Sequence, residues 1–327
     1  MLLDLNRDRP AGADVVDPAF RADVLAGLAL PQKAVPARWF YDRAGSELFE
    51  AITGLPEYYP TRVETALLEA HAREVGAIAG AGRVVVEFGS GSSTKTPHLL
   101  GQVAPAAYVP IDISGEFLRT SAAALAARFP TIDVLPVERD FTAPLRLPEA
   151  LAGLPKLGFF PGSTIGNFAP GAAVDLLRAM AATLGAGAML LIGLDRVKDK
   201  RILIPAYNHA AGVTAAFNLN LLGRINRELD GTIPVGDFAH SGRWVEAQSR
   251  IEMHLVAQRD LAFDVAGTRF AMAAGETIHT ENSHKYGSRD GRLMLRAAGW
   301  EPLAEWVDPD GLFEMVLAEA VPVPFAP

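Results

Sequence analysis

The sequence predicts an α/β protein in which a doubly wound, mostly parallel sheet is joined to a second, α+β domain. Strand-like apolar runs alternate with helical segments from residue 84 to about residue 195, which is typical of consecutive βαβ units. Residues 188–195 are apolar almost throughout, as expected of a strand that is covered on both faces. Beyond residue 195 the alternation stops, and two strand-like segments close the chain. We therefore expect the C-terminus to return to the first sheet.

The N-terminal part of the chain is expected to be mostly helical from residue 17 to about residue 62. It contains an exposed, aromatic-rich connector at 38–42 and a turn at 55–60. A helix over 61–78 then leads to the first sheet strand. The next elements predicted along the chain are a strand from 84, a helix at 96–102, and strands at 107–112 and 131–137.

The second half of the chain has a different pattern. One long helix is predicted over 203–229. It is followed by strand-like segments around 243–259, where apolar and polar residues alternate in 250–256. This region has the pattern of an antiparallel insertion. A helix is expected at 288–298, and after it come two closing strands, the last at 312–318. The charged run at 195–201 is expected to be a solvated connector.

Composition narrows the class of protein. The chain has 327 residues, of which 50% are hydrophobic, so it can bury one large core or two moderate ones. The net charge of −8, with no basic run that interleaves aromatic residues, argues against nucleic acid as a partner. The absence of cysteine excludes disulfides, thiolate nucleophiles and Cys-based zinc sites. Residues 1–10 lack an apolar segment, so we expect a cytoplasmic enzyme with no membrane partner, and a monomer.

A glycine turn directly follows the first sheet strand. In Glu87-x-Gly89-Ser90-Gly91 the two glycines permit backbone angles that a Cβ opposes, and they let a ligand approach the chain closely. The next strand ends in Asp112, 25 positions after Glu87 (112 − 87). An acid at this strand end is placed to accept both ribose hydroxyls of a nucleoside. The alternative is that Asp112 caps the following helix.

The third strand is followed by Asp140 and Phe141. A carboxylate beside an aromatic ring suits an adenine, because the carboxylate can accept from the exocyclic amine while the ring covers the base. Gly89, Asp112 and Asp140 would then lie at the carboxyl ends of consecutive strands, where such sheets bind their ligands.

The glycine pattern distinguishes between two nucleotide cofactors. A dinucleotide site wants a third glycine at the helix start, where this chain has Thr94, and here an acid precedes the first glycine. The pattern favours S-adenosylmethionine. Ser93 replaces the third small residue of many such sites, so the freedom of a glycine is lost there, although its hydroxyl could contact the methionine carboxylate. The expected cofactor-binding residues are Glu87, Gly89, Ser90, Gly91, Ser93, Lys95, Asp112, Asp140 and Phe141.

We expect no metal site from the sequence. Among the seven histidines, His279 and His284 are the pair worth testing. Their spacing of five positions puts the two imidazoles on different faces of a helix and on opposite faces of a strand, so a shared ion is not expected.

Five motifs resemble one known family over nearly the whole chain, from about Trp39 to the C-terminus. The motifs are Tyr41-Asp42-x-x-Gly45-Ser46-x-Leu48-Phe49, Leu55-Pro56-Glu57-Tyr58-Tyr59-Pro60-Thr61-Arg62, Glu87-x-Gly89-Ser90-Gly91, Phe160-Pro161-Gly162-Ser163-Thr164-Ile165-Gly166-Asn167 and Thr280-Glu281-x-Ser283-x-Lys285-Tyr286. In this order they closely resemble the histidine-specific Nα-methyltransferases of ergothioneine biosynthesis, which use S-adenosylmethionine.

The resemblance implies a Rossmann-like methyltransferase sheet and a substrate-binding domain. It implies three successive methyl transfers to the α-amine of L-histidine, giving hercynine. We expect the methyltransferase domain at 63–196 and 286–327, and the substrate-binding domain at 10–62 and 197–285. Matching the family, Asn167 and Tyr207 would bind the carboxylate of histidine, and Gly162 and Thr164 would lie near its amine. The imidazole side would be formed by Tyr58, Glu281 and Ser283, and the pocket wall by Tyr41, Phe49 and Met253.

Elementary chemistry supports the role of Glu281. A buried carboxylate needs a donor, and an imidazole N–H supplies one, so the site should prefer histidine by about 2–3 kcal/mol over a ring without donors. Other interpretations stay open at this stage. Tyr58 could simply pack, Asn167 could be a left-handed turn residue, and Glu281 could be a surface charge. The chain could also methylate another amino acid or amine, or bind the nucleoside without catalysis.

Overall fold

The computed structural model describes residues 17–321. The expectation that rests on residues 1–10 lies outside this range. By contacts between Cα atoms, the described chain divides into two compact units. We call residues 59–197 and 284–321 the first unit, and residues 17–58 and 198–283 the second unit. The chain therefore crosses from one unit to the other at three places, after residues 58, 197 and 283. The longer segment of the second unit, residues 198–283, is an insertion between the two segments of the first unit.

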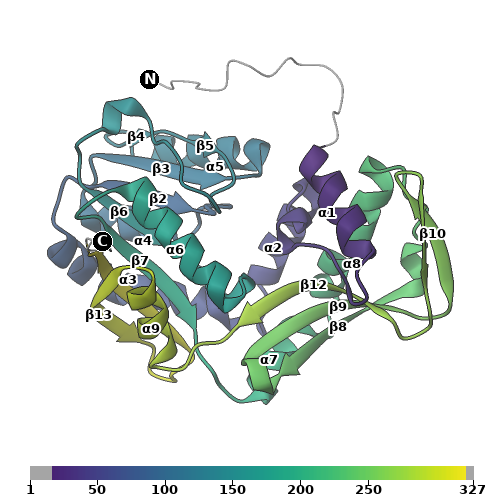
Figure 1. The fold of residues 1–327 in the computed structure, drawn as a ribbon. Coiled ribbons are helices and arrows are strands. Elements are labelled where there is room, and N and C mark those ends of the chain that lie inside the picture. Colours follow the sequence, from purple (N-terminus) through teal and green to yellow (C-terminus); the bar gives the residue numbers. More distant parts are fainter. Residues whose placement is uncertain (1–16, 322–327) are drawn as a thin grey trace, which may run out of the picture. The chain divides into compact units, whose positions relative to one another are not determined.

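An eight-stranded sheet forms the centre of the first unit (Figure 1). Seven strands follow the order β13-β14-β7-β6-β2-β3-β4, and β5 also pairs with β3. The strands β2, β3, β6 and β7 run parallel, whereas β14 lies antiparallel between β7 and β13. This order and the closing antiparallel pair confirm the predicted doubly wound α/β sheet. The strands are β2 (Val84–Phe88), β3 (Ala107–Asp112), β4 (Asp133–Val134), β5 (Val137–Glu138), β6 (Lys156–Phe160), β7 (Met189–Asp195), β13 (Trp300–Val307) and β14 (Phe313–Ala320).

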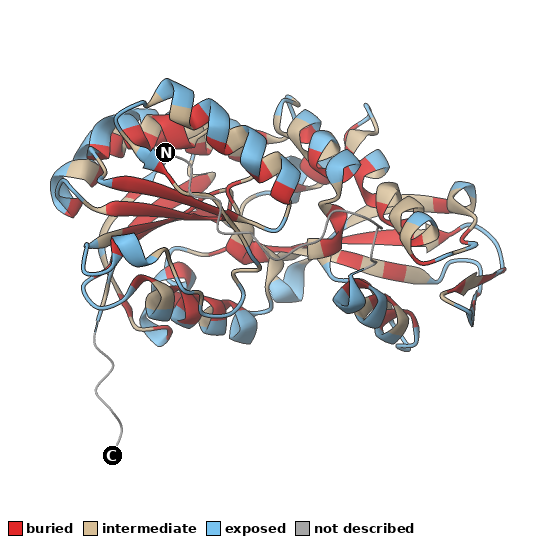
Figure 2. Ribbon diagram, turned by 90° about the horizontal axis from the view of Figure 1, so that it is seen from above, coloured by how far each residue is buried: buried red, intermediate tan, exposed pale blue. Residues whose placement is uncertain are grey.

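Helices cover both faces of this sheet, and the side chains of β2 show how. Val84, Val86 and Phe88 face a cluster that includes α6 and α9, whereas Val85 faces one that includes α3, α4 and α5. In Figure 2 the strands of this sheet are buried along most of their length, while the helices expose their outer sides. The helices are α3 (Tyr59–Ala79), α4 (Thr96–Val103), α5 (Gly115–Arg128), η2 (Glu149–Leu151), η3 (Thr164–Asn167), α6 (Pro170–Leu184) and α9 (Asp290–Ala297).

The strand predicted at 131–137 is wrong as a single element. Two short pieces, β4 and β5, both pair with β3, and they are separated by residues 135–136. Pro136 lies in this gap, and a proline cannot donate a hydrogen bond to a sheet. The break precedes the segment that carries Asp140 and Phe141.

The second unit contains a four-stranded sheet in the order β1-β12-β9-β8 and a separate hairpin of β10 and β11. The pair β8–β9 is antiparallel, as expected, while the short β1 adds parallel to β12. Its strands are β1 (Lys33–Ala34), β8 (Phe238–Val245), β9 (Arg250–Ala257), β10 (Leu261–Val265), β11 (Thr268–Met272) and β12 (Thr277–His284). Its helices are α1 (Pro18–Leu28), η1 (Ala37–Phe40), α2 (Arg43–Thr53), α7 (Lys200–Tyr207), α8 (Val213–Glu228), η4 (Val235–Asp237) and η5 (Glu246–Gln248).

The long helix predicted at 203–229 is instead two helices, α7 and α8. Residues 208–212 separate them, and Gly212 has a left-handed φ of 70°. His209 stabilises the new helix start, because its Nε2 accepts the backbone N–H of Thr214 at 3.1 Å. The apolar periodicity continues across the break, which is why the sequence pattern did not reveal it.

The aromatic connector at 38–42 is not exposed, contrary to expectation. Trp39 and Phe40 are buried, and Phe40 stacks at a tilt on Phe217 with ring centroids 4.5 Å apart. Large aromatic side chains contribute most to a small core, so a short aromatic run more often packs than stays in water. Within residues 17–321, no helix has the length and apolar character needed to cross a membrane.

Candidate functional site

The glycine turn of the first unit follows directly on β2. Gly89 and Gly91 have left-handed φ values of 71° and 49°, which explains the need for glycine at these two positions. A Cβ at Gly89 would lie 3.3 Å from Cε1 of Phe141, so the ring of Phe141 lies directly against the turn. The structure therefore brings together two of the predicted cofactor-binding residues, Gly89 and Phe141, which lie 52 positions apart in the sequence (141 − 89).

Asp112, at the end of β3, is bonded to the same turn. Its Oδ2 accepts the backbone N–H of Gly91 at 2.9 Å, and its Oδ1 accepts that of Ser114 at 2.9 Å. The helix α5 begins at Gly115, with Ser114 as the N-cap residue. Asp112 thus lies two positions before the N-cap residue (114 − 112), and the capping alternative is wrong in that form. Its carboxylate stays partly exposed at the strand end.

Glu87 lies behind the turn and not on it. The side chain is buried, and its Oε2 accepts hydrogen bonds from Tyr108 at 2.5 Å and from Thr96 at 2.7 Å. Burial raises the pKa of Glu87 to about 7, although both hydrogen bonds act to lower it. The carboxylate joins β2, β3 and the start of α4, so it fixes the glycine turn from inside.

Ser93 keeps the conformation of a glycine. Its φ is 54°, in the left-handed region that a side chain disfavours. The hydroxyl is buried and lies 3.2 Å from the hydroxyl of Tyr108. The left-handed turn is therefore kept without glycine, contrary to expectation, while a contact of the hydroxyl with the methionine carboxylate stays a prediction.

Asp140 takes part in a local turn. Its Oδ1 accepts from the backbone N–H of Thr142 at 2.9 Å and from the hydroxyl of Thr142 at 2.7 Å. The preceding residue, Arg139, donates its backbone N–H to the carbonyl of Asp112 at 3.1 Å. The Asp140 segment consequently runs beside the end of β3, next to Asp112, the predicted ribose acid.

The loop after β6 carries Gly162, Thr164 and Asn167. Gly162 has a φ of 80°, and its N–H donates to both oxygens of Glu64 at 3.0 and 2.8 Å. The hydroxyl of Thr164 donates to the carbonyl of Pro161 at 3.0 Å. The left-handed residues here are Gly162 and Ser163, the latter with φ of 56°, whereas Asn167 is the last residue of η3. The interpretation of Asn167 as a left-handed turn residue is wrong.

Glu64 is a functional candidate that the sequence analysis missed. It is 1% exposed, and the ammonium of Lys95 forms a very short ion pair with its Oε2. This carboxylate thereby joins the loop at Gly162 to the predicted cofactor residue Lys95. A signal was present, because Glu64 occupies the buried stripe of α3 that continues through Leu67, Leu68 and Val75.

A second buried charge cluster lies at the end of β7. Asp195 accepts the hydroxyl of Tyr59 at 2.9 and 2.8 Å, and its Oδ2 is 2.6 Å from the ammonium of Lys285. Its own N–H donates to the hydroxyl of Ser163 at 2.9 Å. Asp195 and Lys285 are each buried to 1% exposure of the side chain, so the expectation that 195–201 is wholly solvated fails at Asp195. The three residues Tyr59, Asp195 and Lys285 each lie within two positions of a crossing between the units.

In the second unit, predicted acceptor residues form a continuous aromatic cluster. Edge-to-face contacts link Tyr41 to Phe49 at 5.8 Å, Phe49 to Tyr58 at 6.4 Å and Tyr58 to Tyr207 at 6.5 Å between centroids. The hydroxyl of Tyr207 donates to that of Ser283 at 2.7 Å. Five predicted residues, separated by up to 242 positions (283 − 41), are therefore neighbours. Phe217, which the sequence analysis did not name, contacts Tyr41 and Phe49 from α8.

Met253 and Glu281 come from the neighbouring strands β9 and β12. Met253 is buried, and its backbone carbonyl accepts the hydroxyl of Thr280 at 3.1 Å. Glu281 is partly buried, so it is not a fully solvated surface charge. Seven of the predicted acceptor residues lie in the second unit, while Gly162, Thr164 and Asn167 lie in the first unit with the predicted donor residues.

Comparisons with known proteins show the family to which the chain is similar. Residues 20–320 match the family described as histidine-specific methyltransferase, SAM-dependent. The chain is 41% identical to the histidine N-alpha-methyltransferase of Mycolicibacterium smegmatis, over 94% of this chain and 96% of that protein. It is 40% identical to the histidine N-alpha-methyltransferase of Mycobacterium tuberculosis, over 94% and 97%. A 4-dimethylallyltryptophan N-methyltransferase of Aspergillus fumigatus is 27% identical, over 88% and 89%.

Proposed function

Because the chain belongs to the family of histidine-specific, S-adenosylmethionine-dependent methyltransferases, we propose that it methylates the α-amine of L-histidine three times, giving hercynine. The observation that carries this proposal is the joint presence of two residue sets. One surrounds the glycine turn of the first unit, and the other forms the aromatic cluster of the second unit, each with the residues that the family motifs require. The chain is a methyltransferase, and its acceptor and the number of transfers are what we propose here.

The first unit suits the methyl donor. Asp112, partly exposed at the end of β3, offers carboxylate oxygens to ribose hydroxyls, and Phe141 offers a ring face to the adenine beside Gly89. Gly91 leaves the backbone open to close approach, since no atom beyond its chain neighbours lies within 4 Å of a Cβ placed there. The donor supplies an activated sulfonium methyl group. The protein's contribution on this side is to hold the donor in one orientation.

The second unit suits the acceptor. Tyr207 and Ser283, already joined by a hydrogen bond, present hydroxyl groups for the polar ends of an amino acid. Glu281 would accept an imidazole N–H, which an aromatic ring without donors cannot supply. The rings of Tyr41, Phe49 and Tyr58 enclose the substrate with apolar surface and hold it in place.

Catalysis of this kind depends on orientation and on the exclusion of water. A methyl transfer by direct displacement needs a neutral amine held in line with the methyl group, and it needs no covalent intermediate with the protein. As methyl groups accumulate, the amine becomes a fixed cation. The faces of the tyrosine rings attract such a cation, which favours retention of partly methylated intermediates until the third transfer.

The direct test is the mass of the product formed from histidine and the methyl donor. Gains of about 14, 28 and 42 mass units, one CH₂ increment per transfer, would report the acceptor and the number of methyl groups. A gain that stops at one increment would overturn the three-transfer part of the proposal. The relative that methylates 4-dimethylallyltryptophan motivates a second candidate, an indole amino acid. Faster methylation of such a compound than of histidine would overturn the assignment of the acceptor.

The variant Glu281→Ala tests the acceptor site separately. We expect the KM for histidine to rise by about 30- to 150-fold, which corresponds to about 2–3 kcal/mol for a lost charge-assisted hydrogen bond, with donor affinity unchanged. Glu246→Ala is the matched control, because Glu246 is an exposed acid in the same unit. A collapse of donor binding in Glu281→Ala would show that Glu281 does not belong to the acceptor site.

A further inference from the structure

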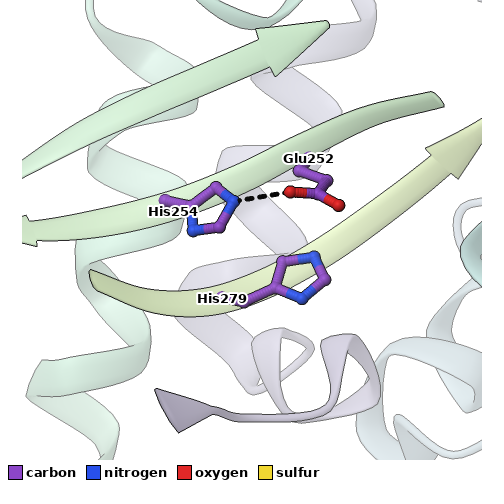
Figure 3. A group of neighbouring side chains, drawn as sticks. All are labelled: Glu252, His254 and His279. Carbon is purple, nitrogen blue, oxygen red and sulfur yellow. Dashed lines mark hydrogen bonds and ion pairs between the residues drawn. The ribbon is translucent and has the colours of Figure 1, made fainter. Parts of the chain in front are cut away.

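Three side chains outside the proposed donor and acceptor sets gather on the sheet of the second unit. Glu252 and His254 come from β9, and His279 comes from β12, the next strand of the sheet. One ligand atom from each residue lies within 4.8 Å of the other two. Figure 3 shows the carboxylate and the two imidazoles turned toward one another on the same face of the two strands.

The cluster is held in place by its neighbours. His254 Nε2 lies 2.9 Å from Glu252 Oε2, and the His254 and His279 rings stack with centroids 4.9 Å apart and planes at 21°. His254 Nδ1 lies 3.1 Å from the hydroxyl of Thr277, which fixes the orientation of this ring. The guanidinium of Arg250 bonds the other carboxylate oxygen, Glu252 Oε1, so only Oε2 faces the imidazoles.

The protonation state suits ligation. Burial lowers the pKa of His254 and of His279, which favours the neutral imidazole. Burial alone would raise the pKa of Glu252, but hydrogen bonds from His254 and Arg250 outweigh it and lower that pKa. Two neutral imidazoles and one carboxylate are the forms in which these residues bind a metal.

We propose that Glu252, His254 and His279 bind one divalent transition-metal ion, of which Zn²⁺ is the best match. Zn²⁺ accepts histidine nitrogen and carboxylate oxygen at about 2.0–2.2 Å, and sites with two histidines and one glutamate are well known. Ligand atoms around a tetrahedral ion lie about 3.3 Å apart at such bond lengths. Small side-chain rotations bring the present atoms to that separation, since they already lie within 4.8 Å of one another.

The donor set also argues against other ions. Mg²⁺ and Ca²⁺ prefer oxygen ligands, whereas two of the three donors here are imidazole nitrogens. Arg250 limits Glu252 to ligation through one oxygen, which leaves the fourth position of a tetrahedral ion for a water molecule. The sequence suggests only His284 as a partner for His279. The register of β12 against β9 decides which residues of β9 lie beside His279, and the sequence does not contain this register.

The site is independent of methyl transfer but not remote from the proposed acceptor residues. His279 lies two positions before Glu281 on β12, and its Nε2 is 3.0 Å from the backbone carbonyl of Glu281. Occupation by a metal would tie β9 to β12 next to this residue. The prediction is therefore one of metal binding and added stability, and it does not require the proposed acceptor to be correct.

The test is a titration of the full-length chain with ZnCl₂ by calorimetry, after treatment with a chelator and dialysis. We expect one ion per chain and a higher Tm in the presence of Zn²⁺. His279→Ala and Glu252→Gln should each weaken Zn²⁺ binding by at least about 10-fold and remove the rise in Tm, in line with the loss of one of three ligands. Glu252→Gln keeps the size and shape of the side chain, so it answers the question if His279→Ala fails to fold.

The matched control is His98→Ala, because His98 also pairs with a glutamate, Glu69, on the surface of the first unit. It should bind Zn²⁺ as the unaltered protein does. The proposal is overturned if the unaltered protein binds no Zn²⁺ at millimolar concentration, or if His279→Ala and Glu252→Gln bind it unchanged. Loss of binding in His98→Ala alone would place the ion elsewhere and would overturn it as well.

Discussion

In the first unit the proposed ligand residues are held by buried charges and backbone amides, whereas in the second unit they are held mainly by aromatic rings. Glu64 and Asp112 accept main-chain N–H groups at 2.8–3.0 Å. Tyr41, Phe49 and Tyr58 instead meet edge to face at 5.8–6.4 Å. Charged hydrogen bonds fix direction, while ring packing fixes shape and area.

This difference indicates which substitutions each unit tolerates without a large loss of stability. Removing one partner of a buried charge pair leaves the other charge without compensation, which is costly. Trimming one hydroxyl from an aromatic cluster removes one hydrogen bond and leaves the packing intact. We therefore expect changes to the buried charges of the first unit to affect stability or donor binding strongly, and small changes to the aromatic cluster of the second unit to affect acceptor binding alone.

The largest effect is expected from Lys285→Met. The change leaves Asp195 buried without its ammonium partner, so the free energy of unfolding should fall by about 3–5 kcal/mol, measured by urea denaturation. Arg296→Met is the control, because the Arg296–Glu301 pair is about half exposed, and water and salt screen such a pair, so its loss should change the stability little. Adding Asp195→Asn to Lys285→Met should restore part of the loss. Equal effects of Lys285→Met and Arg296→Met would erase the contrast between buried and exposed pairs.

The next effect is a pH dependence carried by Glu87. Its pKa is about 7 in the folded protein and about 4.5 when unfolded, so the folded protein binds more protons between these values. Stability from this group is therefore present below pH 4.5 and is lost as the pH rises to 7, by about 3 kcal/mol for 2.5 pKa units. The unfolding free energy of the unaltered protein minus that of Glu87→Gln should fall by this amount from pH 4.5 to pH 8. A difference that is flat over this range would mean that the carboxylate is ionised inside the fold.

A smaller effect is expected from Asp112→Ala. Loss of the ribose acid and of its bond to Gly91 should raise the Kd for S-adenosylmethionine by about 5- to 150-fold, or about 1–3 kcal/mol. Calorimetry with the donor alone measures this value. Asp133→Ala, at an exposed acid on β4, is the control. An unchanged Kd in Asp112→Ala would restrict Asp112 to ordering the turn.

The smallest effect is expected from Tyr207→Phe. It removes the hydroxyl that donates to Ser283, so histidine affinity should fall by about 2- to 12-fold, or 0.5–1.5 kcal/mol, while donor affinity stays unchanged. Calorimetric titration with histidine, in the presence of the demethylated donor, provides the measurement. The double variant Tyr207→Phe with Ser283→Ala should lose less than the sum of the single variants, because the two hydroxyls share one interaction. A larger change in donor than in acceptor affinity would refute the division between the units.

Much of the fold was predictable because local patterns determine it. The apolar runs of β2 and β7 and the acid that ends β3 were identified correctly, since buried parallel strands have a continuous apolar signature. The break between α7 and α8 was not, because the capping of α8 by His209 depends on a side chain five positions away. Because the apolar residues keep a helical spacing through residues 208–212, the sequence pattern alone does not show the break there.

The site was predictable as a set of residue types but not as a network of contacts. The motifs named Tyr207 and Ser283, yet only the fold shows that they bond each other. Glu64 lies in the apolar stripe of α3, which marks it as buried, but its partners Lys95 and Gly162 follow only from the fold, and the same holds for the partners of Asp195. The pairing of His254 with His279 likewise depends on which strands are neighbours in the sheet.

The short strand β1 affects the order in which the protein can fold during synthesis on the ribosome. Lys33 and Ala34 pair with Ile278 and His279, so about 245 residues of chain separate the two partners. Residues 33–34 therefore cannot pair with β12 until synthesis has nearly finished. We expect translation arrested before residue 277 to leave nascent chains in which protease cuts near β1, while β2, β3 and β6, which need only nearby partners, are already protected.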